Sequence, residues 1–150
     1  RQRQMCIRDR FLYRPARLRG QHRQDSGYRH DVAYTARLLP HPITQDLPTG
    51  FAMRDELYLA QVFTDLITPL MTGEASFTRD HFWSAAHAVA GEMFSNRDWD
   101  HPPAPPVIGW TKMAINSRLA YLQPGDGPSA YDNPHYRRLV ERALRWVAGG

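Results

Sequence analysis

A chain of 150 residues with 42% apolar and 11% aromatic residues has the composition of a globular domain, long enough to bury roughly two thirds of its unfolded surface. It has no apolar run near the roughly 20 residues that a membrane-spanning helix needs, and its single cysteine, Cys6, excludes an internal disulfide and a cysteine-based zinc site. The net charge of +4 is uneven, because residues 1–37 carry ten arginines and three aspartates, or +7, whereas the remainder carries −3. The basic segment has no interleaved aromatic residues and no nucleic-acid-binding motif. We therefore expect a cytoplasmic protein with no nucleic-acid partner and no membrane partner.

The first part of the chain shows no helical or strand period. We expect residues 1–27 to be a disordered leader, or one that is not native to the domain, and residues 28–150 to form the domain. Apolar residues then alternate with polar ones over residues 28–39, which predicts a half-buried strand. Three prolines in residues 40–48 predict a loop with one helical turn.

The middle of the chain is predicted to hold two strands and a helix. Residues 56–61 and residues 65–72 are short apolar runs, and Pro69 places the second strand at an edge or a bulge. Apolar residues at helical spacing in residues 78–94 predict a helix capped by Thr78.

A proline-rich loop precedes the last elements. Residues 107–111 and residues 118–123 are apolar runs that predict a hairpin or two neighbouring strands. A helix is then predicted from Pro134, with Asn133 as its N-cap and Gly149 at its end.

Strands followed by helices favour an α/β fold, and open α/β sheets bind ligands beyond the carboxyl ends of their strands. The stretch "PGDGP", which holds Asp126 between two glycines, lies between the last predicted strand and the last predicted helix. One interpretation is that Asp126 only shapes this turn, by accepting backbone N–H groups. The other is that its carboxylate contacts a ligand.

Seven stretches occur in an order that resembles the ThuA-like, or trehalose-utilisation, family: "HPIT", "LP", "DELYL", Trp110-Thr111, "NSRLAYLQPGDGP", "YDNPHYRRL" and "RWVAG". The resemblance covers about residues 28–150. It implies a flavodoxin-like α/β layered sheet, similar to that of class I glutamine amidotransferases, of which this chain would be the C-terminal part, truncated at its N-terminus. It also implies a link to the utilisation of trehalose or a related sugar.

Two positions depart from the family's pattern. Many members carry a Gly-His pair where this chain has Gly125-Asp126. The family usually has a glycine in the loop before the final strand, where this chain has Ile115, and a branched residue resists positive φ. Cys6 lies outside the resembling region and outside any strand-to-helix elbow, so we expect no glutaminase chemistry.

The predicted site residues follow from the turn and from "DELY". The substrate-binding candidates are Asp126, Tyr131, Trp110 and Glu56, with the two aromatic rings expected to stack on a sugar. Asp126 and Glu56 are also the candidates for proton transfer if the protein is an enzyme. Asp55 and Glu56 are neighbours on a strand, so their side chains point to opposite faces and do not form an acid/base pair.

Alternatives to this interpretation stay open. Glu56 could simply bind a backbone group or an arginine, and the domain could be a non-catalytic sugar-binding or protein-interaction module. Asp98, Asp100 and His101 lie close together on a loop, but a solvated loop is the better interpretation. We expect no metal and no cofactor, a sugar or sugar derivative as the partner, and leave homo-oligomer formation open.

Overall fold

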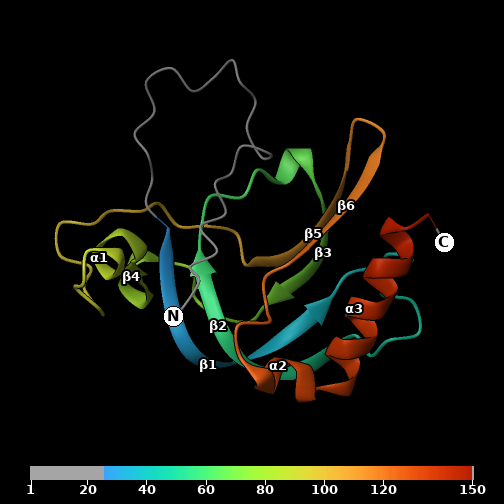
Figure 1. The fold of residues 1–150 in the computed structure, drawn as a ribbon, viewed down its shortest axis with the longest axis horizontal. Helices are drawn as coiled ribbons and strands as arrows, with labels where there is room; N and C mark the ends of the chain where they lie inside the picture. Colours follow the sequence, from blue (N-terminus) through green and yellow to red (C-terminus); the bar gives the residue numbers. More distant parts are fainter. Residues whose placement is uncertain (1–25, 150) are drawn as a thin grey trace.

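The computed structural model describes residues 26–149, in which a curled antiparallel sheet lies beside a long C-terminal helix (Figure 1). Cys6 and nearly all of the predicted leader fall outside the described residues. The strands are β1 (Gly27–Leu38), β2 (Gly50–Leu59), β3 (Thr68–Gly73), β4 (Trp83–Ser84), β5 (Val107–Ala114) and β6 (Ser117–Leu122). The helices are α1 (Ala85–Val89), α2 (Pro128–Asp132) and α3 (Pro134–Val147), with short 3-10 turns η1 (Thr64–Leu66) and η2 (Arg79–His81).

The strand order is β2-β1-β3-β5-β6, with β4 paired to the start of β1. Every strand pairing among the described residues is antiparallel. The predicted mixture of strands and helices is therefore confirmed, whereas the flavodoxin-like layering is not. Pro69 lies in β3 beside an irregularity in its pairing with β5, which confirms the predicted bulge. The pairing of β1 with β3 covers only residues 71–73, so Pro69 has a paired strand on one side alone.

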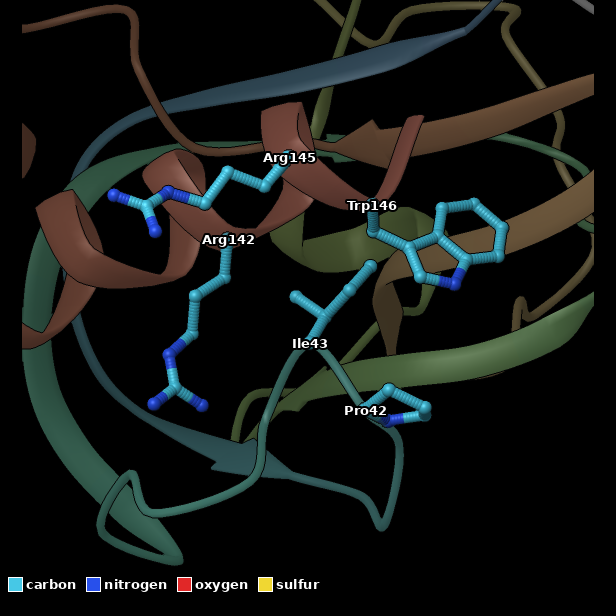
Figure 2. Close-up of a pocket in the computed structure, with 5 residues that line it drawn as sticks. All are labelled: Pro42, Ile43, Arg142, Arg145 and Trp146. Carbon is cyan, nitrogen blue, oxygen red and sulfur yellow. The ribbon is translucent and has the colours of Figure 1, made fainter. Parts of the chain in front are cut away.

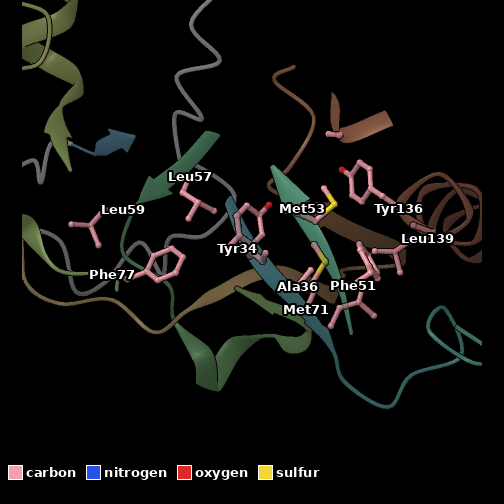
Figure 3. Close-up of a cluster of buried hydrophobic side chains, with 14 of the residues drawn as sticks. Tyr34, Ala36, Phe51, Met53, Leu57, Leu59, Met71, Phe77, Tyr136 and Leu139 are labelled. Carbon is pink, nitrogen blue, oxygen red and sulfur yellow. The ribbon is translucent and has the colours of Figure 1, made fainter. Parts of the chain in front are cut away.

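The core forms where β1 and β2 turn alternate residues to the same side. Tyr34 pairs with Met53 and Ala36 with Phe51, and all four side chains are buried. Leu139 of α3 belongs to the same buried cluster (Figure 3). Burying such a side chain contributes roughly 1.5–3 kcal/mol. The period of two in β1 and the helical period in α3 therefore supply two faces of one core.

Helix α3 begins as its sequence predicts. The Asn133 side chain accepts hydrogen bonds from the backbone N–H groups of His135 and Tyr136, at 2.9 and 3.2 Å. Gly149, at φ +93°, lies just beyond the helix end. The buried residues of α3 are Tyr136, Leu139 and Ala143, whereas Leu144 and Val147 near its C-terminal end are exposed.

The prediction of a long helix over residues 78–94 is wrong. Thr78 makes no capping bond, and the only α-helix in this segment is the short α1, which Ser84 caps. Phe82 is extended and fully buried, and Trp83 pairs with β1. Tertiary burial of the aromatic residues and pairing with β1 therefore override the helical propensity of the alanines.

Strands β5 and β6 form the predicted hairpin, and Ile115 lies in its turn. Ile115 adopts φ +56° and is 95% exposed. For a β-branched residue this left-handed conformation is strained, and no packing of the side chain compensates for it. The departure noted at this position is therefore a local strain that the hairpin tolerates.

Replacing Ile115 by asparagine should raise the free energy of unfolding by about 0.5–1 kcal/mol, because asparagine tolerates the left-handed region. Urea denaturation of the parent and the variant would measure the change. Ile115→Val is the matched control, since it keeps the branched Cβ and should show no such gain. Equal stabilities of the asparagine and valine variants would contradict the strain.

The outer edge of β2 is covered by the segment that follows β6. The Asn133 amide donates to the Ala52 carbonyl at 2.8 Å, and the Ser129 hydroxyl donates to the Arg54 carbonyl at 3.1 Å. These side chains satisfy carbonyl groups that a neighbouring strand would otherwise bind.

Gln123 completes this cover and joins the two ends of the sheet. Its amide oxygen accepts from the Tyr58 N–H at 3.1 Å, and its amide nitrogen donates to the Tyr58 carbonyl at 3.3 Å. Its own backbone N–H donates to Ile108 of β5 at 2.8 Å. Gln123 thus links β5 to the far edge of the curled sheet, and this closure places the turn after β6 beside β2.

Among the described residues, no helix has both the length and the apolar character needed to cross a bilayer.

Candidate functional site

An irregularity in β1 directs His30 toward β2. Arg29 pairs with Leu57 and Val32 with Asp55, so β1 has one residue more than β2 between these two pairs. Such a bulge re-aims the side chain at the extra position. Asp31, in the bulge, adopts φ +56°.

An ion pair spans the bulge. The Arg54 guanidinium donates two hydrogen bonds to the Asp31 carboxylate, at 2.6 and 2.7 Å. Both side chains are exposed, so the pair contributes little to overall stability. Its two-pronged geometry instead holds Asp31, and with it the backbone on one side of His30.

Glu56 lies beside His30 in a largely dry position. Its carboxylate lies 2.9 Å from His30 Nδ1, and its side chain is only 7% exposed. Its second oxygen, Oε2, accepts a hydrogen bond from the Tyr58 hydroxyl. Burial raises the pKa of Glu56, and the neighbouring charges of Asp126 and Asp55 raise it further, against the lowering effects of Tyr58 and His30.

Asp55, the neighbour of Glu56, holds the turn between β6 and α2. Its carboxylate is buried and accepts from the Gly125 N–H at 2.5 Å and from the Gly127 N–H at 3.2 Å. The two hydrogen bonds flank Asp126 on both sides. The backbone geometry of the turn is therefore set by Asp55, and the Asp126 carboxylate is left free of that task.

We call the two hydrogen bonds from the turn to the Asp55 carboxylate the clamp by Asp55. This clamp places Asp126 beside His30 and Glu56. One ligand atom from each of the three side chains lies within 4.8 Å of the others. Among the described residues, this is the group of histidine and acidic side chains that comes close enough to share an ion. The sequence predicted Glu56 and Asp126 as site residues, and the structure places them together.

Tyr131 lies over the same turn. A Cβ built on Gly125 would come within 2.5 Å of the Tyr131 hydroxyl, and the Tyr131 side chain is 46% exposed. Its ring packs against Tyr136, whose hydroxyl donates to the Pro124 carbonyl at 2.5 Å. Tyr131 therefore borders the turn, and its role with a sugar stays a prediction.

Trp110 is in a different setting. It is 5% exposed, and its ring stacks on Tyr121 at a centroid distance of 5.1 Å. Trp110 was predicted to stack on a sugar, but in this structure its ring stacks on Tyr121 instead.

An exposed aromatic ring that was not predicted from the sequence lies beside the cluster formed by His30, Glu56 and Asp126. Phe94 is 58% exposed, and its ring meets His30 edge-on at 6.2 Å and Tyr28 at 6.5 Å. The Tyr28 hydroxyl accepts from the Phe94 N–H at 3.0 Å and so holds this residue in place. The chain around Phe94 was predicted to be helical, and that error concealed the contact.

The loop that carries Asp98, Asp100 and His101, also considered as a metal site, does not bring these three side chains together. His101 is buried with its Nδ1 2.7 Å from the Pro102 carbonyl, whereas Asp98 and Asp100 are exposed.

The "HPIT" loop and α3 border a separate, open pocket of about 160 Å³, lined by Pro42, Ile43, Arg142, Arg145 and Trp146 (Figure 2). Both arginines already have partners, because Arg142 donates to the Gln45 carbonyl and Arg145 pairs with Glu141. We therefore interpret this contact as structural packing between the two family stretches.

The fold is that of a mixed α/β protein with a curled antiparallel sheet, and a cluster of one histidine and two carboxylates lies where the sheet closes. The chain belongs to the ThuA family, described as trehalose utilisation, whose family model matches residues 10–147. The match confirms the resemblance and begins upstream of Tyr28. Searches of curated proteins and of solved structures gave no significant match.

Proposed function

We propose that this domain binds a sugar or sugar derivative at the cluster of His30, Glu56 and Asp126, in the utilisation of trehalose or a related sugar. The observation that carries the proposal is the meeting of these three polar side chains at the turn after β6, in a chain of the ThuA family. Carboxylates accept hydrogen bonds from sugar hydroxyls, and a few converging polar groups are typical of small-molecule sites.

Phe94 supplies the apolar wall that such a site needs. Its exposed ring lies on the His30 side of the cluster, where it offers a face to the C–H groups of a sugar ring. Aromatic side chains bury a large apolar area at low entropic cost, so they suit a ligand whose edges are polar and whose faces are not.

The two carboxylates differ in environment, since Glu56 is buried and Asp126 is exposed. Both stay the candidates for proton transfer predicted from the sequence. The absence of glutaminase chemistry also stays a prediction, because Cys6 lies outside the described residues.

Replacing Asp126 by asparagine should weaken sugar binding by roughly 1.5–3 kcal/mol, the range for a hydrogen bond to a charged group. The turn should survive, because Asp55 and not Asp126 holds its backbone. The measurement is calorimetric titration of the 150-residue chain with a panel of disaccharides and keto-sugars.

The matched control is Asp98→Asn, which makes the same chemical change at another exposed aspartate, outside the cluster. It should bind like the parent. Equal affinities of the parent and Asp126→Asn, with a clear binding signal, would remove Asp126 from the site.

A further inference from the structure

We propose that His30, Glu56 and Asp126 form a binding site for a divalent first-row transition-metal ion. His30 Nδ1 and one oxygen from each carboxylate would be the three protein ligands. This site goes beyond sugar binding through hydrogen bonds, and it was not foreseen from the sequence, where no metal was expected.

The spacing of the ligand atoms suits one ion. Ligands at 2.0–2.2 Å from a shared ion lie about 3–4 Å from each other, by the usual bond lengths of zinc to histidine and carboxylate. His30 Nδ1 and the Glu56 carboxylate, at 2.9 Å, already lie near this spacing. The largest separation in the group, within 4.8 Å, needs only a small closing movement. The exposed Asp126 side chain can make it.

The donor set indicates the class of ion. One imidazole nitrogen with two carboxylate oxygens suits Zn²⁺ or Mn²⁺, whereas Ca²⁺ and Mg²⁺ prefer oxygen ligands alone. The charge also fits, because a divalent cation offsets two carboxylates of which one, Glu56, is almost fully buried.

Neighbouring groups hold each ligand from outside, as is usual around bound metals. The Tyr58 hydroxyl occupies Glu56 Oε2 and so leaves Oε1 facing His30. The bulge in β1 aims His30, and the clamp by Asp55 fixes the backbone on both sides of Asp126.

Three protein ligands leave coordination positions open. We infer that two neighbouring oxygens of the sugar, from a diol or a hydroxy-ketone, would take these positions. This role of the ion as an anchor rests on the proposed function, whereas the metal site itself does not.

The test is calorimetric titration of the EDTA-treated, dialysed 150-residue chain with ZnCl₂ and MnCl₂, with MgCl₂ and CaCl₂ as comparison ions. We expect one site that prefers Zn²⁺ or Mn²⁺. Glu56→Gln and Asp126→Asn should each lower the affinity by at least about 100-fold, since loss of a ligand exceeds the roughly 10–100-fold effect of outer groups. Asp98→Asn, the matched control, should leave it unchanged.

Circular dichroism of the metal-free variants shows whether they are folded. Asp126→Asn keeps the test decisive even if Glu56→Gln does not fold, because Asp126 is exposed. Equal metal affinity of Asp126→Asn and the parent, or no preference over Mg²⁺ and Ca²⁺, would overturn the metal site.

A second titration, with the sugar in the presence of EDTA or of the ion, separates the two proposals. Sugar binding only with the ion supports the anchor. Equal sugar binding in EDTA would overturn the anchor and leave the proposed function standing. Metal binding without any sugar binding would leave the metal site standing and overturn the proposed function.

Discussion

Replacing Asp55 by asparagine is expected to lower the free energy of unfolding by about 2–4 kcal/mol. The buried carboxylate accepts from the N–H groups of Gly125 and Gly127, and hydrogen bonds to a charged group contribute roughly 1.5–3 kcal/mol each. An asparagine side chain keeps one oxygen acceptor, so its NH₂ group would face the other N–H and leave it without a partner. Because small domains have only about 5–15 kcal/mol of stability, this loss is a large share.

Urea denaturation followed by circular dichroism would measure the change. Asp126→Asn is the matched control, because it makes the same substitution within the turn, at the residue between Gly125 and Gly127. It should lower the free energy of unfolding by no more than about 1 kcal/mol, because Asp126 does not bind the two glycine N–H groups. If the two variants were equally stable, Asp55 would not be what holds the turn. The Asp55 variant should also lose ligand binding, since Asp126 would no longer be held near Glu56.

Gly125→Ala should destabilise the chain by about 2–4 kcal/mol, for two separate reasons. Gly125 adopts φ +128°, a conformation that costs residues with a Cβ about 1–3 kcal/mol. The added Cβ would also lie 2.5 Å from the Tyr131 hydroxyl, so that Tyr131 or the turn must shift. A shift of the turn would disturb the hydrogen bond from the Gly125 N–H to Asp55.

Gly91→Ala separates the two costs. Gly91 also has a positive φ, at +93°, but an added Cβ there would meet no atom within 4 Å. Thermal or urea denaturation should therefore show a smaller loss for Gly91→Ala than for Gly125→Ala. Adding Tyr131→Phe to the Gly125 variant should recover part of the difference, because it removes the hydroxyl. No recovery, with equal losses at the two glycines, would show that Tyr131 does not constrain the turn.

Local patterns were sufficient where a segment's own residues decide its structure. The alternation in residues 28–39 predicted β1, and Asn133 followed by Pro134 predicted the start of α3. The segment 78–94 failed because Phe82 is buried in an extended conformation and Trp83 pairs with β1. Those contacts are distant in sequence, and no helical period records them.

The site could be predicted in part for the same reason. Glu56 and Asp126 lie in two family stretches, so the resemblance pointed to both. His30 was missed because a bulge in β1 directs it, and a bulge depends on the register between two strands. Asp31 was the one local signal, since aspartate is among the residues that tolerate the left-handed conformation it adopts. The role of Asp55 as the clamp was also missed, because its partners are backbone groups far along the chain.

The cover over β2 also affects how the chain behaves when it opens partially. Gln123, Ser129 and Asn133 satisfy the outer edge of β2 with side chains. If the segment after β6 detaches, that edge becomes free while β1 still pairs with β2 on the other side. A free strand edge bearing apolar residues such as Phe51 and Met53 is a template for pairing between molecules. Partial opening should therefore lead to self-association through β2, and a ligand that joins Glu56 to Asp126 would protect the protein from aggregation by keeping that segment attached.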